Sequence, residues 1–114
     1  MTTPLLLRAV ATGPKSWALE QLRRVLDLHG WVEDVHFYSG VMIAFQLELR
    51  GAQVAAFAVH LRQVDVFLDA ESEAALAAWA RAHTHDAPDL AAILNASFPS
   101  GDPDVHNEIP RVPG

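Results

Sequence analysis

Two histidines and an aspartate lie close together at His83, His85 and Asp86, and these residue types can ligate a divalent metal ion. His106 would supply a further imidazole from the C-terminal region. The same residues also suit a structural role, because histidine is favourable at the C-terminal end of a helix and Asp86 can cap a following helix. Since a second pair of ligands at defined spacing is missing, the metal site stays a hypothesis beside the capping interpretation.

A second group of candidate residues alternates with apolar residues along the predicted strands. By this alternation, one face of the sheet is expected to carry Arg8, His36, Tyr38, Met42, Gln46, Glu48 and Phe67. A mixed face of this kind suits a small-molecule pocket, a dimer interface or the seat of a helix. His36 and Glu48 are also compatible with a general acid–base pair, although a cross-strand polar pair explains them more simply.

The sequence predicts no catalytic residue and no cofactor. It contains no cysteine, which removes disulfides, thiolate nucleophiles, iron–sulfur clusters and cysteine-bound zinc. No serine lies in a Gly-x-Ser-x-Gly motif, and no glycine-rich phosphate loop is present. These features favour a protein that binds over one that catalyses.

The charge distribution argues against several partners. The formal net charge is −6, and residues 70–114 carry seven acids against Arg81 and Arg111 alone. Such an excess of negative charge disfavours nucleic acid and anionic membrane surfaces. The N-terminus lacks the features of a signal peptide, and no apolar run approaches the roughly 20 residues of a membrane span. We expect a soluble, cytoplasmic protein.

The hydrophobic period changes in a regular order along the first 69 residues. It predicts strands over 5–11, 31–38, 41–49 and 64–69, with a helix that ends at His29 and a second helix over 52–63. This order predicts an α+β, ferredoxin-like βαββαβ fold. The expected sheet is four-stranded and antiparallel, in the order four, one, three, two, with both helices on one face.

Two further helices are predicted after the last strand, over 71–83 and about 88–97. We therefore expect a single domain over residues 1–98. Residues 99–114 contain four prolines and several acids, which predicts an extended tail. Trp79 on the first of these helices is a candidate interface residue, because aromatic rings outside a core are enriched at interfaces.

These features together favour a small non-enzymatic binding protein that forms a homodimer or meets a protein partner through the outer sheet face and the C-terminal segment. One alternative is a small-molecule sensor, since the predicted topology resembles that of amino-acid-binding regulatory domains. That resemblance implies a ligand at a dimer interface near the loop Thr12-Gly13-Pro14. A second alternative is a small enzyme or metal-binding protein that uses His36 or the His83, His85 and Asp86 cluster.

Overall fold

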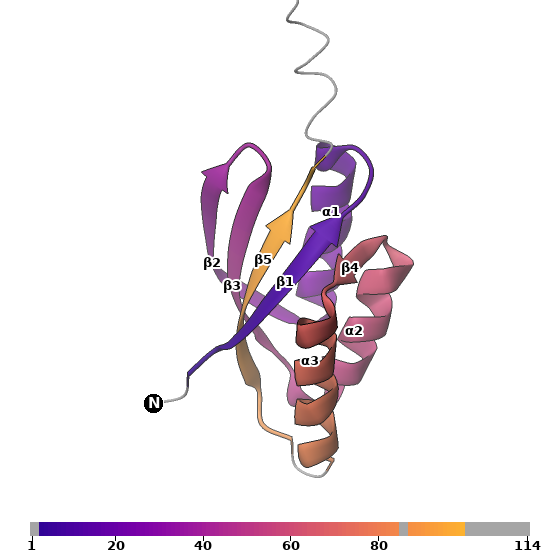
Figure 1. Cartoon of the computed structure of the whole chain (residues 1–114). Helices are drawn as coiled ribbons and strands as arrows, with labels where there is room; N and C mark the ends of the chain where they lie inside the picture. Colours follow the sequence, from indigo (N-terminus) through magenta and orange to yellow (C-terminus); the bar gives the residue numbers. More distant parts are fainter. Residues whose placement is uncertain (1–2, 85–86, 100–114) are drawn as a thin grey trace, which may run out of the picture.

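The computed structural model describes residues 3–84 and 87–99 of the 114-residue chain. These residues form an α+β fold in which three α-helices accompany a mixed five-stranded sheet (Figure 1). The elements in chain order are β1 (Leu5–Ala11), α1 (Lys15–His29), β2 (Gly30–Ser39), β3 (Met42–Leu49), the 3-10 turn η1 (Gly51–Gln53), α2 (Val54–Gln63), β4 (Val66–Leu68), α3 (Ala70–Ala82) and β5 (Leu90–Ser97).

The strand order across the sheet is β2-β3-β5-β1-β4. Strand β5 runs parallel to β1 on one side and antiparallel to β3 on the other, and the remaining neighbours are antiparallel. The predicted order of elements through α3 is confirmed. The predicted four-stranded antiparallel sheet is not, because a fifth strand lies between β1 and β3, which were expected to be neighbours.

The prediction of a helix over 88–97 is wrong, because Leu90–Ser97 forms strand β5. Short runs of alanine and leucine fit both the helical and the strand period, because Leu90, Ile93 and Leu94 share one face of a helix whereas Leu90, Ala92 and Leu94 share one face of a strand. In the structure Leu90, Ala92, Leu94 and Ala96 are buried, whereas the residues between them are half-buried. Pairing with both β1 and β3 satisfies the backbone of this segment, and this tertiary context overrides its helix propensity.

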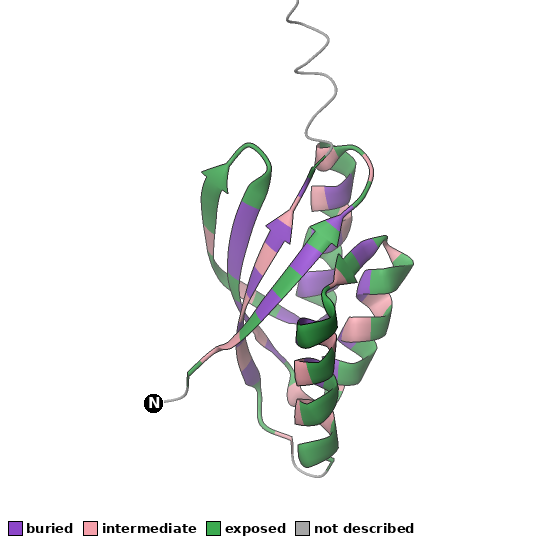
Figure 2. Cartoon of the chain, in the orientation of Figure 1, coloured by how far each residue is buried: buried purple, intermediate pink, exposed green. Residues whose placement is uncertain are grey.

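The hydrophobic core lies between one face of the sheet and helices α1 and α2. The largest fully buried side chains include Phe45, Phe57 and Phe98, and Figure 2 shows buried positions alternating along the central strands. The alternation of Phe37 with His36 and Tyr38 along 31–38 predicts a core position for Phe37, and this prediction is wrong, because Phe37 is 68% exposed. It lies on β2, an edge strand with one neighbour, close to the hairpin that joins β2 to β3.

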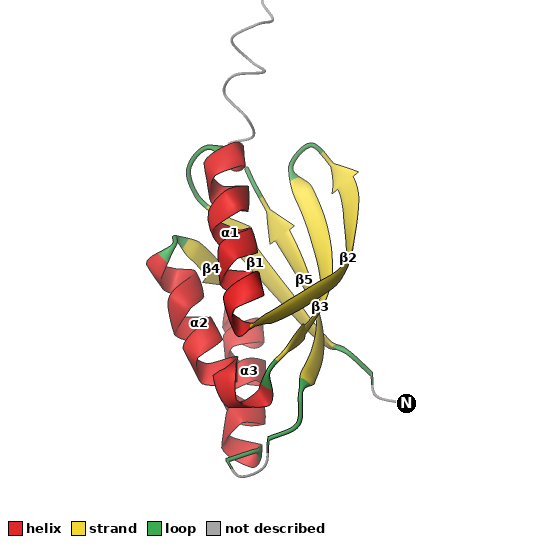
Figure 3. Cartoon of the chain, turned by 180° about the vertical axis from the view of Figure 1, so that it is seen from behind, coloured by secondary structure: helices red, strands yellow, loops and turns green. Residues whose placement is uncertain are grey.

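Helix α3 continues along β1 where β4 ends. Asp69 caps its N-terminus by accepting a hydrogen bond from the Ser72 backbone N–H at 2.8 Å. The Ser72 hydroxyl in turn accepts from the backbone N–H of Arg8 at 2.8 Å, and the Asp69 N–H donates to the Arg8 carbonyl oxygen. These bonds satisfy the edge of β1 beyond its pairing with β4. Consequently, α3 lies beside the sheet instead of covering its outer face (Figures 1 and 3).

No described helix is long and apolar enough to span a membrane. Residues 100–114, which hold most of the predicted tail, lie outside the described residues, as do His85 and Asp86.

Candidate functional site

The outer face of the sheet is left uncovered by the three described helices. Helix α1 lies behind the sheet in Figure 1, and Figure 3 shows the same helix in front of it from the reverse side. The outer face carries large apolar side chains that remain substantially exposed: Leu6 at 65%, Val10 at 45%, Tyr38 at 68%, Met42 at 38% and Phe67 at 46%. Exposed apolar side chains gathered on one face indicate a contact surface.

Strand register places these side chains in rows across the strands. Val10 on β1 pairs with Phe67 on β4 and with Ser97 on β5, and Ser97 pairs with Met42 on β3. Tyr38 stands at the β2 end of the same row, beside a register shift. The next row runs from Arg8 through Asn95 and Ala44 to His36.

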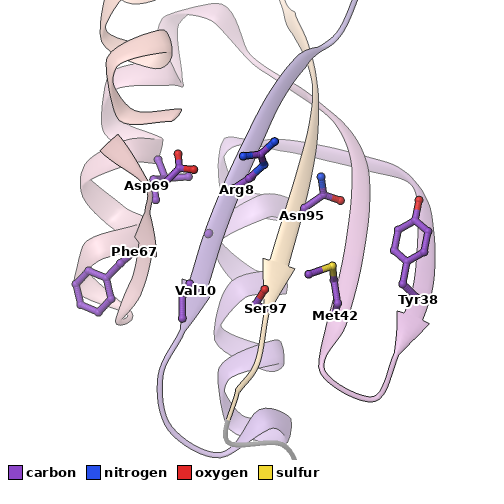
Figure 4. Close-up of a pocket in the computed structure, with 10 residues that line it drawn as sticks. Arg8, Val10, Tyr38, Met42, Phe67, Asp69, Asn95 and Ser97 are labelled. Carbon is purple, nitrogen blue, oxygen red and sulfur yellow. The ribbon is translucent and has the colours of Figure 1, made fainter. Parts of the chain in front are cut away.

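A trough of about 740 Å³ crosses this face at the end nearer the β2–β3 hairpin (Figure 4). Its lining includes Asn95 and Ser97 of β5, whose side chains are short. Val10 and Phe67 lie on one side of them, and Met42 and Tyr38 lie on the other. The hollow follows β5 because that strand carries small side chains where its neighbours carry large ones.

Four of the predicted outer-face residues therefore line this trough: Arg8, Tyr38, Met42 and Phe67. Asn95 and Ser97 were not predicted on this face, because their segment was expected to be a helix. Asp69, which follows β4 and lines the trough beside Arg8, was not predicted there either. An aspartate two residues before Glu71 and three before Ser72 is a capping signal that would have located Asp69, though not its place at the trough.

Asp69 is held in its ionised form by its position at the start of α3. Hydrogen bonding from the Ser72 side chain, and then from the Ser72 backbone, lowers the pKa of Asp69. The positive charge of Arg8 lowers this pKa further by a smaller amount. One side of the trough thus presents a guanidinium next to a carboxylate that is already engaged by the helix N-terminus.

The remaining predicted outer-face residues lie away from the trough. His36 and Glu48 point to the same face, but they pair with Ala44 and Trp31 respectively. Their positions are four residues apart along the β2–β3 ladder, which corresponds to about 13 Å. His36 instead approaches Asp34, at 3.2 Å between Nε2 and Oδ2. The structure therefore does not form the proposed acid–base pair.

Glu48 and Gln46 occupy the part of β3 nearer its C-terminal end. Partial burial, and then the negative charge of Glu33, raises the pKa of the Glu48 carboxyl. Gln46 is exposed and pairs with Ile93 of β5. This end of the face is acidic, in contrast to the apolar row at the trough.

Trp79 and His83 lie away from the outer sheet face, on and just after α3. Their rings stack with centroids 4.2 Å apart, and His83 Nδ1 donates to the Trp79 carbonyl oxygen at 2.9 Å. These contacts match the capping interpretation of His83. Among residues 3–84 and 87–99, no three histidine or acidic side chains gather into a group suited to a metal. His85, Asp86 and His106 of the proposed metal site lie outside those ranges.

A histidine pair with one buried member is a feature that the sequence did not reveal. His29, at the end of α1, is 6% exposed, and its ring meets that of His60 on α2. Its other ring nitrogen contacts Gln53 Oε1 at 2.8 Å. The regular recurrence of Gln53 and His60 on one side of the predicted helix was visible, but nothing in the sequence indicated that His29 faces them.

The loop Thr12-Gly13-Pro14 joins β1 to α1 and lies next to the start of β4. The Thr12 N–H donates to the Asp65 carbonyl oxygen at 3.1 Å, and Gly13 has a φ of +88°. Its residues do not line the trough on the outer face.

Comparisons with known proteins give no assignment: no family model, no curated protein and no solved structure matches the chain. The function is therefore argued from the outer face itself.

Proposed function

We propose that this protein is a binding protein that forms a homodimer through the outer face of its sheet. The observation that carries the proposal is the layout of large side chains on either side of β5. Phe67 and Val10 lie on the β4–β1 side, and Met42 and Tyr38 lie at the same level on the β3–β2 side. A face with this layout is self-complementary, as an isologous dimer interface requires.

The expected symmetry of this dimer is a two-fold rotation. A two-fold axis parallel to β5, midway between two facing sheets, places Phe67 against Tyr38 of the partner subunit. The same axis places Val10 against Met42 of the partner subunit, and Ser97 faces its own copy. Face-to-face sheets pack about 10 Å apart with their strands within about 30° of each other, so these side chains are long enough to meet.

The polar row is compatible with the same axis. Asp69 and His36 occupy opposite ends of that row, since Asp69 bonds to the backbone of Arg8 and His36 pairs with Ala44. The axis therefore brings Asp69 near His36 of the partner subunit. Arg8 meets the small side chain of Ala44 of the partner subunit, which leaves room for the guanidinium. No like charges are opposed within these two rows.

The available area is close to what a stable dimer needs. Five strands of three to ten residues, spaced by about 4.8 Å and rising about 3.3 Å per residue, present a projected face of roughly 570 Å². Side-chain relief makes the accessible area larger than this projection. A standard-size interface removes about 800 Å² from each partner, so the outer face can supply a specific interface of modest size.

Native mass spectrometry and light scattering of the purified chain test this proposal. We expect a dimer for the wild type and a monomer for Val10→Glu, because the substitution places a carboxylate in the apolar row of both subunits. The control is Phe37→Glu, which replaces an apolar residue on the opposite face of β2 that is more exposed than Val10, at 68% against 45%. The control is expected to remain a dimer.

Three results would contradict the proposal. The first is a wild-type monomer at concentrations of about 100 μM, well above the Kd of a specific interface. The second is a Val10→Glu variant that stays dimeric, and the third is a Phe37→Glu variant that dissociates equally. A wild-type monomer that co-purifies with a different protein would likewise contradict the homodimer.

A further inference from the structure

We infer that the trough over β5 binds a small carboxylic acid with a flat apolar body, with its carboxylate at Arg8 and Asn95. The inference deepens the proposed function, because the two-fold axis along β5 would turn two facing troughs into one enclosed cavity. It does not require the dimer, since all the residues that it uses lie in one chain. It assigns a chemical class of ligand to a surface otherwise described only as a contact face.

Except for Asp69, each polar side chain that lines the trough can donate a hydrogen bond. Arg8 offers a guanidinium, and Asn95, Ser97 and Tyr38 offer an amide and two hydroxyl groups. Among the described residues, Arg8 forms no ion pair within 4.0 Å, so its guanidinium group remains available to a ligand. A carboxylate matches a guanidinium with two parallel hydrogen bonds and is the simplest complement of these donors.

Asp69 lies beside these donors, but its carboxylate is engaged by the N-terminus of α3. Asp69 accepts the hydrogen bond of the Ser72 N–H at the N-terminus of α3, and that contact orients one carboxylate oxygen toward the helix. Helix N-termini carry partial positive charge, which compensates the charge of Asp69 locally. A cationic ligand would therefore find Arg8 opposing it and Asp69 already engaged, whereas an anionic ligand finds free donors.

The apolar side chains of the trough indicate the shape of the remaining part of the ligand. Aromatic rings stand at the two outer ends of the trough, Phe67 on β4 and Tyr38 on β2, with Val10 and Met42 inside them (Figure 4). The distance between the polar row and this apolar row is two residues along a strand, or about 7 Å. A ligand with a carboxylate and a ring system about 7 Å away spans both rows, and the volume of about 740 Å³ lies in the range of small-molecule sites.

The test uses 2-naphthoate and its neutral analogue 2-naphthamide as probes, titrated into the ¹⁵N-labelled full chain. We expect 2-naphthoate to shift the backbone resonances of Arg8 and Ser97 and the side-chain amide resonances of Asn95. Arg8→Gln should weaken naphthoate binding about tenfold, the loss expected for one charge-assisted hydrogen-bond pair. Its naphthamide affinity should not change.

Arg23→Gln provides the matched control, because it removes the same charge from an exposed position on α1, behind the sheet. This variant should bind naphthoate like the wild type. The inference is overturned if naphthoate causes no shifts at about 1 mM. Equal binding of naphthamide by the wild type, or equal weakening in both arginine variants, would also overturn it.

The oligomeric state is measured on the same samples, which separates this inference from the proposed function. A monomer that prefers naphthoate and loses the preference in Arg8→Gln supports the ligand site and contradicts the dimer. A dimer that ignores naphthoate contradicts only the ligand site.

Discussion

His29 Nε2 lies 3.0 Å from His60 Nδ1, so one proton joins two rings that come from different helices. The direction of this bond follows from Gln53, whose Oε1 can only accept and therefore requires a proton on His29 Nδ1. His29 Nε2 then accepts, and His60 Nδ1 donates. The chain of bonds ties η1, α1 and α2 together beneath Phe57, whose ring meets that of His29 edge-on.

These hydrogen bonds predict energetic coupling between His29 and His60. His60→Leu leaves a buried nitrogen of His29 without a partner, which should lower the free energy of unfolding by about 1–3 kcal/mol. In a double-mutant cycle with His29→Leu, the two losses should fall short of additivity by about 0.5–3 kcal/mol. Urea unfolding of the wild type, the two single variants and the double variant measures these free energies.

A polar-to-leucine substitution away from the pair and from the outer sheet face provides the control. Gln63→Leu, at the exposed C-terminal end of α2, should change stability by less than about 0.5 kcal/mol. Additive losses in the cycle would show that the two histidines do not interact in solution.

The N-cap of α3 predicts acid sensitivity. The pKa of Asp69 is lowered in the folded state by its hydrogen bonds to Ser72, so the folded chain binds a proton there less readily than the unfolded chain. Its contribution to stability is therefore present above the usual aspartate value of 3.8 and is lost as the pH falls through the lowered folded pKa. Asp69→Asn, which keeps a capping oxygen, should lose stability at neutral pH and match the wild type in strong acid.

Thermal unfolding between neutral pH and pH 2 checks this profile. Ser72→Ala removes the main cause of the lowered pKa and should flatten the same pH dependence. If the difference between wild type and Asp69→Asn stays constant down to pH 2, the charge of Asp69 plays no part in the cap.

Glu48 predicts a pH dependence of stability that is opposite in sign to that of Asp69. Its pKa is raised by partial burial and by Glu33, so the folded chain binds a proton there more readily than the unfolded chain does. The associated stability is fully present below the usual glutamate value of 4.5 and is lost as the pH rises through the raised folded pKa. Glu48→Gln should therefore raise the melting temperature at neutral pH, and the gain should vanish near pH 3.

Glu33→Gln separately tests the smaller cause of the raised pKa of Glu48, which is the negative charge of Glu33. It relieves the charge repulsion while leaving Glu48 half-buried, so its gain at neutral pH should be smaller than that of Glu48→Gln. A melting temperature that falls in Glu48→Gln would mean that the carboxylate makes a favourable contact of its own.

The sequence predicted the fold well where one period dominated. The alternation over 41–49 and the leucine stripe of α1 left no competing interpretation, and the corresponding buried residues, such as Leu22, Phe45 and Leu47, lie in the core. The segment 90–97 carried two compatible periods. Its choice of strand depends on pairing with β1 and β3, a long-range relationship that a local pattern does not encode.

The same error limited the prediction of the candidate site. Arg8, Tyr38, Met42 and Phe67 were placed correctly on one face, because alternation along a strand determines which face a side chain takes. The trough between them arises only because β5, with Asn95 and Ser97, lies between β1 and β3. The hollow therefore depends on the one strand that the sequence analysis took for a helix.

Gly30 shows how closely β2 and β3 approach where α1 ends. A glycine directly after a helix predicts a left-handed C-terminal stop, but the φ of Gly30 is −177° and its backbone is extended. A Cβ at this position would fall on the carbonyl group of Glu48 in the facing strand, so the glycine is required by space and not by its φ. Gly30→Ala should lower the free energy of unfolding by about 1–3 kcal/mol, the usual cost of overpacking a buried site.

Gly40 supplies the matched control for that substitution, because a Cβ there would meet nothing within 4 Å. Since this glycine of the β2–β3 hairpin also lacks a positive φ, Gly40→Ala should be neutral or stabilise the fold by up to about 1 kcal/mol. Urea unfolding of both variants compares the same chemical change at a crowded and an open position of one hairpin. Equal effects at the two positions would mean that the ladder between Gly30 and Leu49 opens readily, and that α1 could pass into β2 without a glycine.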